Sequence, residues 1–113
     1  MRTTKKYKIV IRDFALVNLE EIYFYIAYVD YRPIIAANVI DAIHHTIKDK
    51  IAIRPLAYKK MFENNDQTIR FALCKNYKII FTVNDDVIEI ITIIYGARGD
   101  DYLSEAIDIS RSK

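Results

Sequence analysis

The chain of 113 residues has a single cysteine, two glycines, two prolines and no tryptophan. The lone Cys74 excludes an internal disulfide and has no Cys or His partner set that would hold a metal. We interpret it as a small buried residue of a strand rather than a reactive thiol. The scarcity of glycine and proline, with no low-complexity run, leaves little that would stay disordered. We therefore expect residues 1–113 to form one domain with its own core.

Long hydrophobic runs are also missing. The basic start of the chain has an apolar run of only Ile9 to Ile11 before Arg12 and Asp13, which is too short for a signal peptide. No stretch approaches the roughly 18 apolar residues of a membrane-spanning helix. A lone cysteine suits a reducing compartment, so we expect a cytoplasmic protein that does not enter a membrane.

The motifs of several common enzyme classes do not occur: HExxH, GxxxxGK[ST], GxGxxG and GxSxG are all missing. Metal-hydrolase, nucleotide-binding and serine-hydrolase functions therefore lose their usual support. His44 and His45 are neighbours on a predicted helix, so their side chains point about 100° apart and do not clamp a metal as an i, i+4 pair would. We expect no metal and no cofactor.

Charge is unevenly distributed, although the net charge is only +2. Residues 2–12 carry five bases and no acid, residues 13–31 carry four acids and no base, and residues 48–60 carry five bases against one acid. Such separate patches favour a charged partner, either nucleic acid or an acidic protein. On charge alone, the solvated faces of an ordinary small protein explain the pattern equally well.

The hydrophobic pattern of the first half predicts a strand followed by two helices. Residues 7–11 are β-branched and aromatic, as in a strand. Asp13 is a plausible N-cap for a first helix that ends near Asp30, and a second helix runs from Pro33 to about Ile53. The helices form an antiparallel hairpin, because their connection is very short. Their apolar residues recur every three or four positions: Ala15, Leu19, Ile22, Ile26 and Val29, then Ala36, Ile40, Ile43, Ile47 and Ile51.

The second half predicts sheet. Residues 56–67 show no period and are predicted to be a loop with room for a turn of helix. Residues 69–74, 77–83 and 87–95 are rich in β-branched and aromatic residues and are separated by short Asn- and Asp-containing turns, so they form an antiparallel meander. The last strand is almost wholly apolar and is expected to be central. The fold class is therefore α+β: a helical hairpin packed on a small, mostly antiparallel sheet, in the order βααβββ, with a short C-terminal tail or a helix at 101–109.

Cations and phenols accumulate on or just after the three late strands. Adjacent cations on a sheet face repel one another, so their grouping would need an anionic partner. Such a patch would bind phosphates or stabilise the charge that develops as a hydroxyl attacks a phosphodiester. The alternative is ordinary surface ion pairs, such as Lys78 with Glu89 across strands. The residues concerned are Arg70, Lys78, Tyr95, Arg98 and Tyr102.

Several strings, taken in order, resemble the RelE/ParE superfamily, the toxins of bacterial type II toxin-antitoxin pairs. Each string is weak alone, but together they cover nearly the whole chain at the usual spacing. The most telling is the run from Tyr77 through the Asn-Asp-Asp turn to Arg98. The strings are YKIVI at 7–11, ALVNLEEIYFYI at 15–26, IRPLAY at 53–58, KNYKIIFTVNDDVIEIITIIYGAR at 75–98 and YLSEA at 102–106.

The resemblance implies one of two activities, between which fold alone does not choose. RelE-like toxins are endoribonucleases that cut messenger RNA on the ribosome, and by that pattern Lys78, Arg98 and Tyr102 would be catalytic. ParE-like toxins, the plasmid-stabilisation type, inhibit DNA gyrase, and Arg70, Lys78, Tyr95 and Arg98 would bind the target. Lysine, arginine and tyrosine transfer protons poorly at neutral pH, because their ordinary pKa values are about 10 or more. We therefore expect a gyrase inhibitor, with the ribonuclease as the alternative.

The resemblance also implies a cognate antitoxin, with which the chain would form an oligomer. A segment of the antitoxin would wrap the toxin as an added strand or helix. Tyr23 and Tyr28 on the first helix are the expected contacts. A third hypothesis is a family member that binds antitoxin without being toxic. We expect Arg98→Ala to abolish toxicity while antitoxin binding persists; a fully toxic mutant would contradict this.

Overall fold

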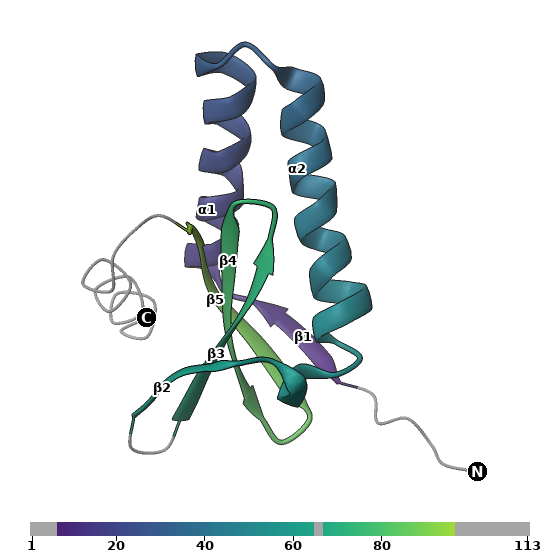
Figure 1. Cartoon of the computed structure of the whole chain (residues 1–113), viewed down its shortest axis with the longest axis vertical. Coiled ribbons are helices and arrows are strands. Elements are labelled where there is room, and N and C mark those ends of the chain that lie inside the picture. Colours follow the sequence, from purple (N-terminus) through teal and green to yellow (C-terminus); the bar gives the residue numbers. More distant parts are fainter. Residues whose placement is uncertain (1–6, 65–66, 97–113) are drawn as a thin grey trace.

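The computed structural model describes residues 7–64 and 67–96, which form a helical hairpin packed on a five-stranded sheet (Figure 1). The strand order is β1-β5-β4-β3-β2. β1 (Lys8–Ile11) runs parallel to β5 (Val87–Tyr95), and all other neighbours are antiparallel. The other strands are β2 (Lys60–Asn64), β3 (Gln67–Cys74) and β4 (Tyr77–Asn84). The predicted α+β class with a mostly antiparallel sheet is confirmed.

Both helices of the hairpin end in a π-helical turn. α1 (Asp13–Phe24) continues into η1 (Tyr25–Val29), and α2 (Pro33–Thr46) continues into η2 (Ile47–Ile51). Asp13, the predicted N-cap, is instead the first helical residue, where its carboxylate still favours the positive end of the helix dipole. None of the described helices combines the length and the apolar character that crossing a membrane would require.

The main core lies between the hairpin and one face of the sheet. Ala15, Leu19 and Ile26 are buried as predicted, but Val29 is half exposed. The reason is visible in Figure 1, where the far half of the hairpin projects beyond the end of the sheet. Cys74 is buried, as expected for a small residue of a strand. The sheet residues of this core include Ala72, Ile79, Phe81, Ile88, Ile90 and Ile93.

The opposite face of the sheet carries a second, smaller cluster of Ile69, Ile80, Ile91 and Ile94. β5 contributes to both clusters and lies between β1 and β4, so the prediction of an interior last strand is confirmed.

Residues 56–67 were predicted to be a loop with room for a turn of helix. The turn of helix is present, but the loop prediction is wrong where the chain forms β2 and the start of β3. A 3₁₀ turn, η3 (Pro55–Ala57), is followed by β2, which pairs with β3 and has a register shift between Lys60 and Phe62. The amide of Phe71 also donates to the carbonyl of Lys59 at 3.2 Å. Segment 60–64 therefore forms a strand because the edge of β3 offers it backbone hydrogen-bond partners. Its own composition, poor in strand-forming residues, does not indicate a strand.

A bulge interrupts β5 and is held by a buried asparagine of α1. Ile80 pairs with Thr92 but the next residue, Phe81, pairs with Ile90, so β5 has an extra residue there. Asn18 is 6% exposed. Its Oδ1 accepts hydrogen bonds from the Thr92 hydroxyl at 2.6 Å and from the Ile93 amide at 2.9 Å. This one side chain therefore fixes both the bulge and the position of α1 against β5.

Candidate functional site

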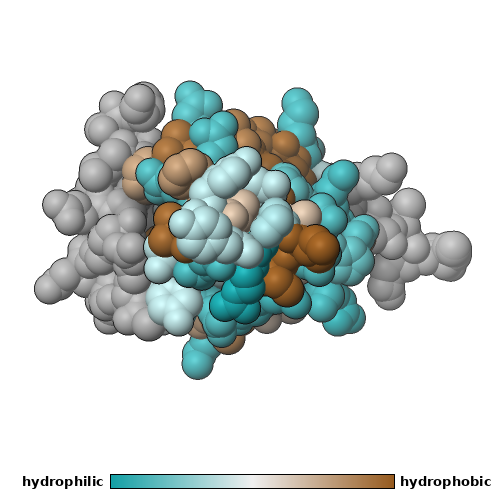
Figure 2. Space-filling view, turned by 90° about the horizontal axis from the view of Figure 1, so that it is seen from above, coloured by the Kyte–Doolittle hydropathy of each residue, from teal (hydrophilic) through white to brown (hydrophobic). Residues whose placement is uncertain are grey.

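The projecting end of the hairpin exposes an unusual concentration of large apolar side chains, which we call the aromatic tip. Tyr31 is 84% exposed, Ile34 75% and Tyr28 61%, and the rings of Phe24 and Tyr28 lie 5.2 Å apart. Seen from above, this end of the molecule shows hydrophobic and near-neutral surface with hydrophilic side chains between and around it (Figure 2). Exposed apolar patches of this kind mark interaction sites. The aromatic tip comprises Phe24, Tyr25, Tyr28, Val29, Tyr31, Ile34 and Ile35.

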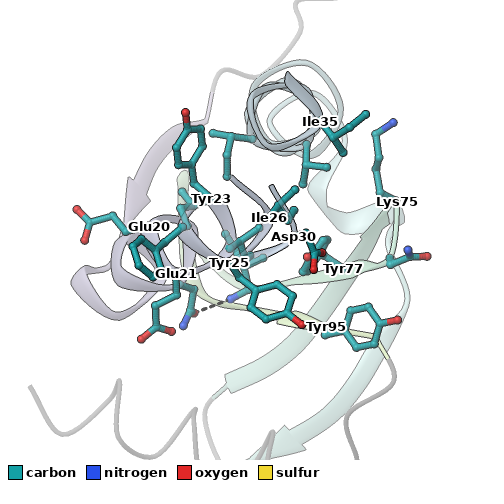
Figure 3. Close-up of a pocket in the computed structure, with 18 of the residues that line it drawn as sticks. Glu20, Glu21, Tyr23, Tyr25, Ile26, Asp30, Ile35, Lys75, Tyr77 and Tyr95 are labelled. Atoms are coloured by element: carbon teal, nitrogen blue, oxygen red, sulfur yellow. Dashed lines mark hydrogen bonds between the residues drawn. The ribbon is translucent and has the colours of Figure 1, made fainter. Parts of the chain in front are cut away.

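The aromatic tip forms one wall of a long groove. α1, η1 and α2 line one side, and the β3–β4 turn and the ends of β4 and β5 line the other. Glu20 and Glu21 lie along the α1 side, and Tyr77 and Tyr95 lie on the sheet side (Figure 3). The groove is therefore apolar in its depth and acidic along the rim formed by α1.

Three tyrosines and a carboxylate meet at one end of the groove (Figure 3). The rings of Tyr77 and Tyr95 pack edge to face, with centroids 5.8 Å apart and planes inclined at 71°. Burial raises the pKa of Tyr77, and the nearby Tyr95, Asp30 and Tyr25 raise it further. Because an ordinary tyrosine already ionises near pH 10, the Tyr77 phenol is neutral at physiological pH.

The structure does not bring the predicted cations Arg70 and Lys78 together. Arg70 pairs in register with Phe81 on the helix side of the sheet, and its guanidinium donates to the Tyr58 carbonyl at 2.8 Å. Lys78 pairs with Leu73 on the other side, and its ammonium lies 5.3 Å from the centre of the Phe71 ring. Arg70 thus tethers the segment before β2, and its predicted role in target binding stays a prediction.

Lys78 and Tyr95 do line one shallow depression, together with Leu73 and Gly96. The Lys78–Glu89 ion pair, named above as an example of the alternative, does not form. In the β4–β5 strand pair, Lys78 lies opposite Ile94. Glu89 lies opposite Thr82, near the other end of this strand pair, and forms an ion pair with Arg12. The turn at Asp85 and Asp86 sets this register, because it places Lys78 far from the turn and Glu89 close to it.

Two other predicted site residues, Arg98 and Tyr102, lie outside the described residues, as does the predicted helix at 101–109. On α2, His45 forms an exposed ion pair with Asp49 at 2.8 Å. Within residues 7–64 and 67–96, no three His, Cys, Asp or Glu side chains are grouped as metal ligands would be.

Sequence reasoning missed the roles of Asn18, Asp30 and Tyr77. A signal for Asn18 was present, because it is the polar residue three positions after Ala15 on the buried face of the first helix. No comparable signal existed for Asp30 and Tyr77, which are 47 positions apart in the sequence and meet only through tertiary packing.

No protein family model matches the chain, and no curated protein matches it. Solved structures do match it in three dimensions. A chain of the chromosomal ParDE toxin-antitoxin system from P. aeruginosa superposes with a TM-score of 0.63 at 17% identity, covering 80% of this chain and 96% of that one. A chain of the RelBE2 toxin-antitoxin complex from Mycobacterium tuberculosis superposes with a TM-score of 0.58 at 14% identity, covering 87% of this chain and 100% of that one. The chain therefore has the RelE/ParE fold that its sequence strings predicted.

Proposed function

We propose that this chain is the toxin of a type II toxin-antitoxin pair. The observation that carries the proposal is the aromatic tip, which is a large exposed apolar surface on a fold shared with chains of two toxin-antitoxin complexes. A surface of this kind needs a protein partner to cover it. An antitoxin is the partner that this fold suggests.

The groove beside the aromatic tip suits an amphipathic helix of the antitoxin. A helix docked there would bury apolar side chains between the hairpin and the sheet ends and would leave its polar face outside. Tyr23 and Tyr28 are both exposed and both line the groove, which agrees with their proposed role in antitoxin binding. Tyr28→Ser should therefore weaken neutralisation while toxicity remains.

For the activity itself, we propose inhibition of DNA gyrase. A ribonuclease that transfers protons at neutral pH needs an acid or base within reach of the substrate. The depression around Lys78 and Tyr95 is lined, in the part of the chain that the structure describes, by no carboxylate or imidazole. Both histidines of the chain belong to α2, away from this depression. These features favour a binding inhibitor over a ribosome-dependent messenger endoribonuclease.

Induction of the chain alone in growing bacteria, with translation and DNA supercoiling followed in parallel, tests the proposal. Gyrase inhibition predicts that DNA breaks and filamentation precede any fall in translation. If translation stops within minutes and messenger fragments appear, the chain is a RelE-like nuclease, with Lys78, Arg98 and Tyr102 as its catalytic residues. Unchanged growth would contradict toxicity and leave a protein that only binds its antitoxin.

A further inference from the structure

Tyr25, Tyr77 and Tyr95 bring three aromatic rings to the same end of the groove. Tyr25 comes from η1, Tyr77 begins β4 and Tyr95 ends β5. The edge-to-face packing of Tyr77 and Tyr95 sets two ring planes at a steep angle, so they form two walls of a corner. Tyr25 and Tyr95 are 56% and 48% exposed, and the corner is therefore open to a ligand.

A carboxylate stands beside these rings. Asp30 is exposed at the end of η1 and lies close enough to Tyr77 to raise the pKa of its phenol. Asp30 belongs to neither the Arg12–Glu89 nor the His45–Asp49 ion pair. Two cations, Arg32 and Lys75, also line the groove, and the ammonium of Lys75 points away from the rings (Figure 3). Asp30 thus places a negative charge next to three aromatic rings.

We propose that Tyr25, Tyr77, Tyr95 and Asp30 form an aromatic cage for a lysine or arginine side chain of the protein partner. The proposal deepens the proposed function, because it states which chemistry the antitoxin segment presents at this end of the groove. A cation over an aromatic face is attracted by the quadrupole of the ring, and aromatic cages bind cationic groups in this way. A neighbouring carboxylate adds charge attraction. Glu20 and Glu21 also line the groove, but their carboxylates point away from the cage (Figure 3).

Other occupants fit the corner less well. An anion would be repelled by Asp30 and by the ring faces. A metal ion would find one carboxylate and neutral phenols, which are poor ligands. A purely apolar side chain would leave the carboxylate without a partner and would not use the ring quadrupoles. The charge of the occupant is therefore what distinguishes this proposal from simple hydrophobic docking.

NMR tests the cage. The tyrosine ring resonances of the intact protein are followed while one of three matched probes is added. The probes are the N-acetyl methylamides of lysine, of norleucine as its neutral analogue, and of glutamate. We expect the lysine probe to shift the rings of Tyr25, Tyr77 and Tyr95 in a saturable way and to bind roughly fivefold more tightly than the norleucine probe. Equal binding of lysine and norleucine probes, or no saturable shift of these rings, would overturn the proposal.

Two exposed positions allow variants that leave the core untouched. Tyr25→Leu removes one ring and Asp30→Asn removes the charge, and each should weaken lysine-probe binding roughly threefold or more. Tyr31→Leu and Asp41→Asn are the matched controls, because both residues are exposed and neither lines the groove. Growth arrest and its neutralisation are measured separately. A chain that is not toxic but binds the lysine probe refutes the proposed function alone, and a neutralised toxin that ignores the probe refutes the cage alone.

Discussion

Asn18 has a small polar side chain, but its removal should lower the free energy of unfolding by much more than its size suggests. Its Oδ1 accepts the amide of Ile93 and the hydroxyl of Thr92, and at 6% exposure there is little room for water to replace it. Asn18→Ala leaves the Ile93 amide without this acceptor, and a buried unsatisfied donor costs about 1–3 kcal/mol. The Thr92 hydroxyl can rotate and adds less. We therefore expect the free energy of unfolding to fall by about 2–3 kcal/mol.

Urea unfolding followed by circular dichroism measures this change. Thr92→Val removes one donor but leaves the bond from Ile93, so it should cost only about 1 kcal/mol. Val17→Ala, at the preceding and exposed position of α1, should stay within about 0.5 kcal/mol of the unmodified protein. If Asn18→Ala lowers the free energy of unfolding no more than Val17→Ala does, the bulge does not depend on the Asn18 side chain, and its proposed role is refuted.

Three further predictions concern Tyr77, Arg70 and Cys74. Burial, followed by the charge of Tyr95, raises the pKa of Tyr77, so the folded state keeps a proton that the unfolded chain loses near pH 10. The free energy of unfolding should therefore fall as the pH rises above about 10. Tyr77→Phe should remove this part of the fall. Identical pH profiles would contradict this. Arg70→Met should lower the free energy of unfolding by about 1–3 kcal/mol in urea titrations, because the Tyr58 carbonyl loses its donor. Cys74 is buried, so it should react with a thiol reagent much more slowly in the folded protein than in urea; equal rates would refute its burial.

Much of the fold could be predicted because local signals agreed with the tertiary structure. The strand at 87–95 has the predicted bounds, since an apolar run between two turns leaves few alternatives. β2 could not be predicted in the same way, because its conformation depends on its pairing with β3 and not on its composition. The two helices cover the predicted stretches to within two residues, at 13–29 and 33–51, but their last turns are π-helical, which no propensity signals.

The candidate site was less predictable because it depends on register. A two-residue turn at Lys75 and Asn76 sets Cys74 opposite Tyr77, and by alternation Arg70 then falls opposite Phe81 on the helix side, away from Lys78. That separation could have been deduced from the sequence. The meeting of the tyrosines at the groove could not, because it depends on how the hairpin lies across the ends of β4 and β5.

A supercoiling assay with purified DNA gyrase and purified chain tests the central claim most directly. We expect the chain to inhibit supercoiling or to trap cleaved DNA at stoichiometric amounts, and the cognate antitoxin to restore gyrase activity. Unaffected gyrase, combined with cleavage of messenger RNA on isolated ribosomes by the same preparation, would contradict gyrase inhibition and assign the chain to the nuclease branch of the fold.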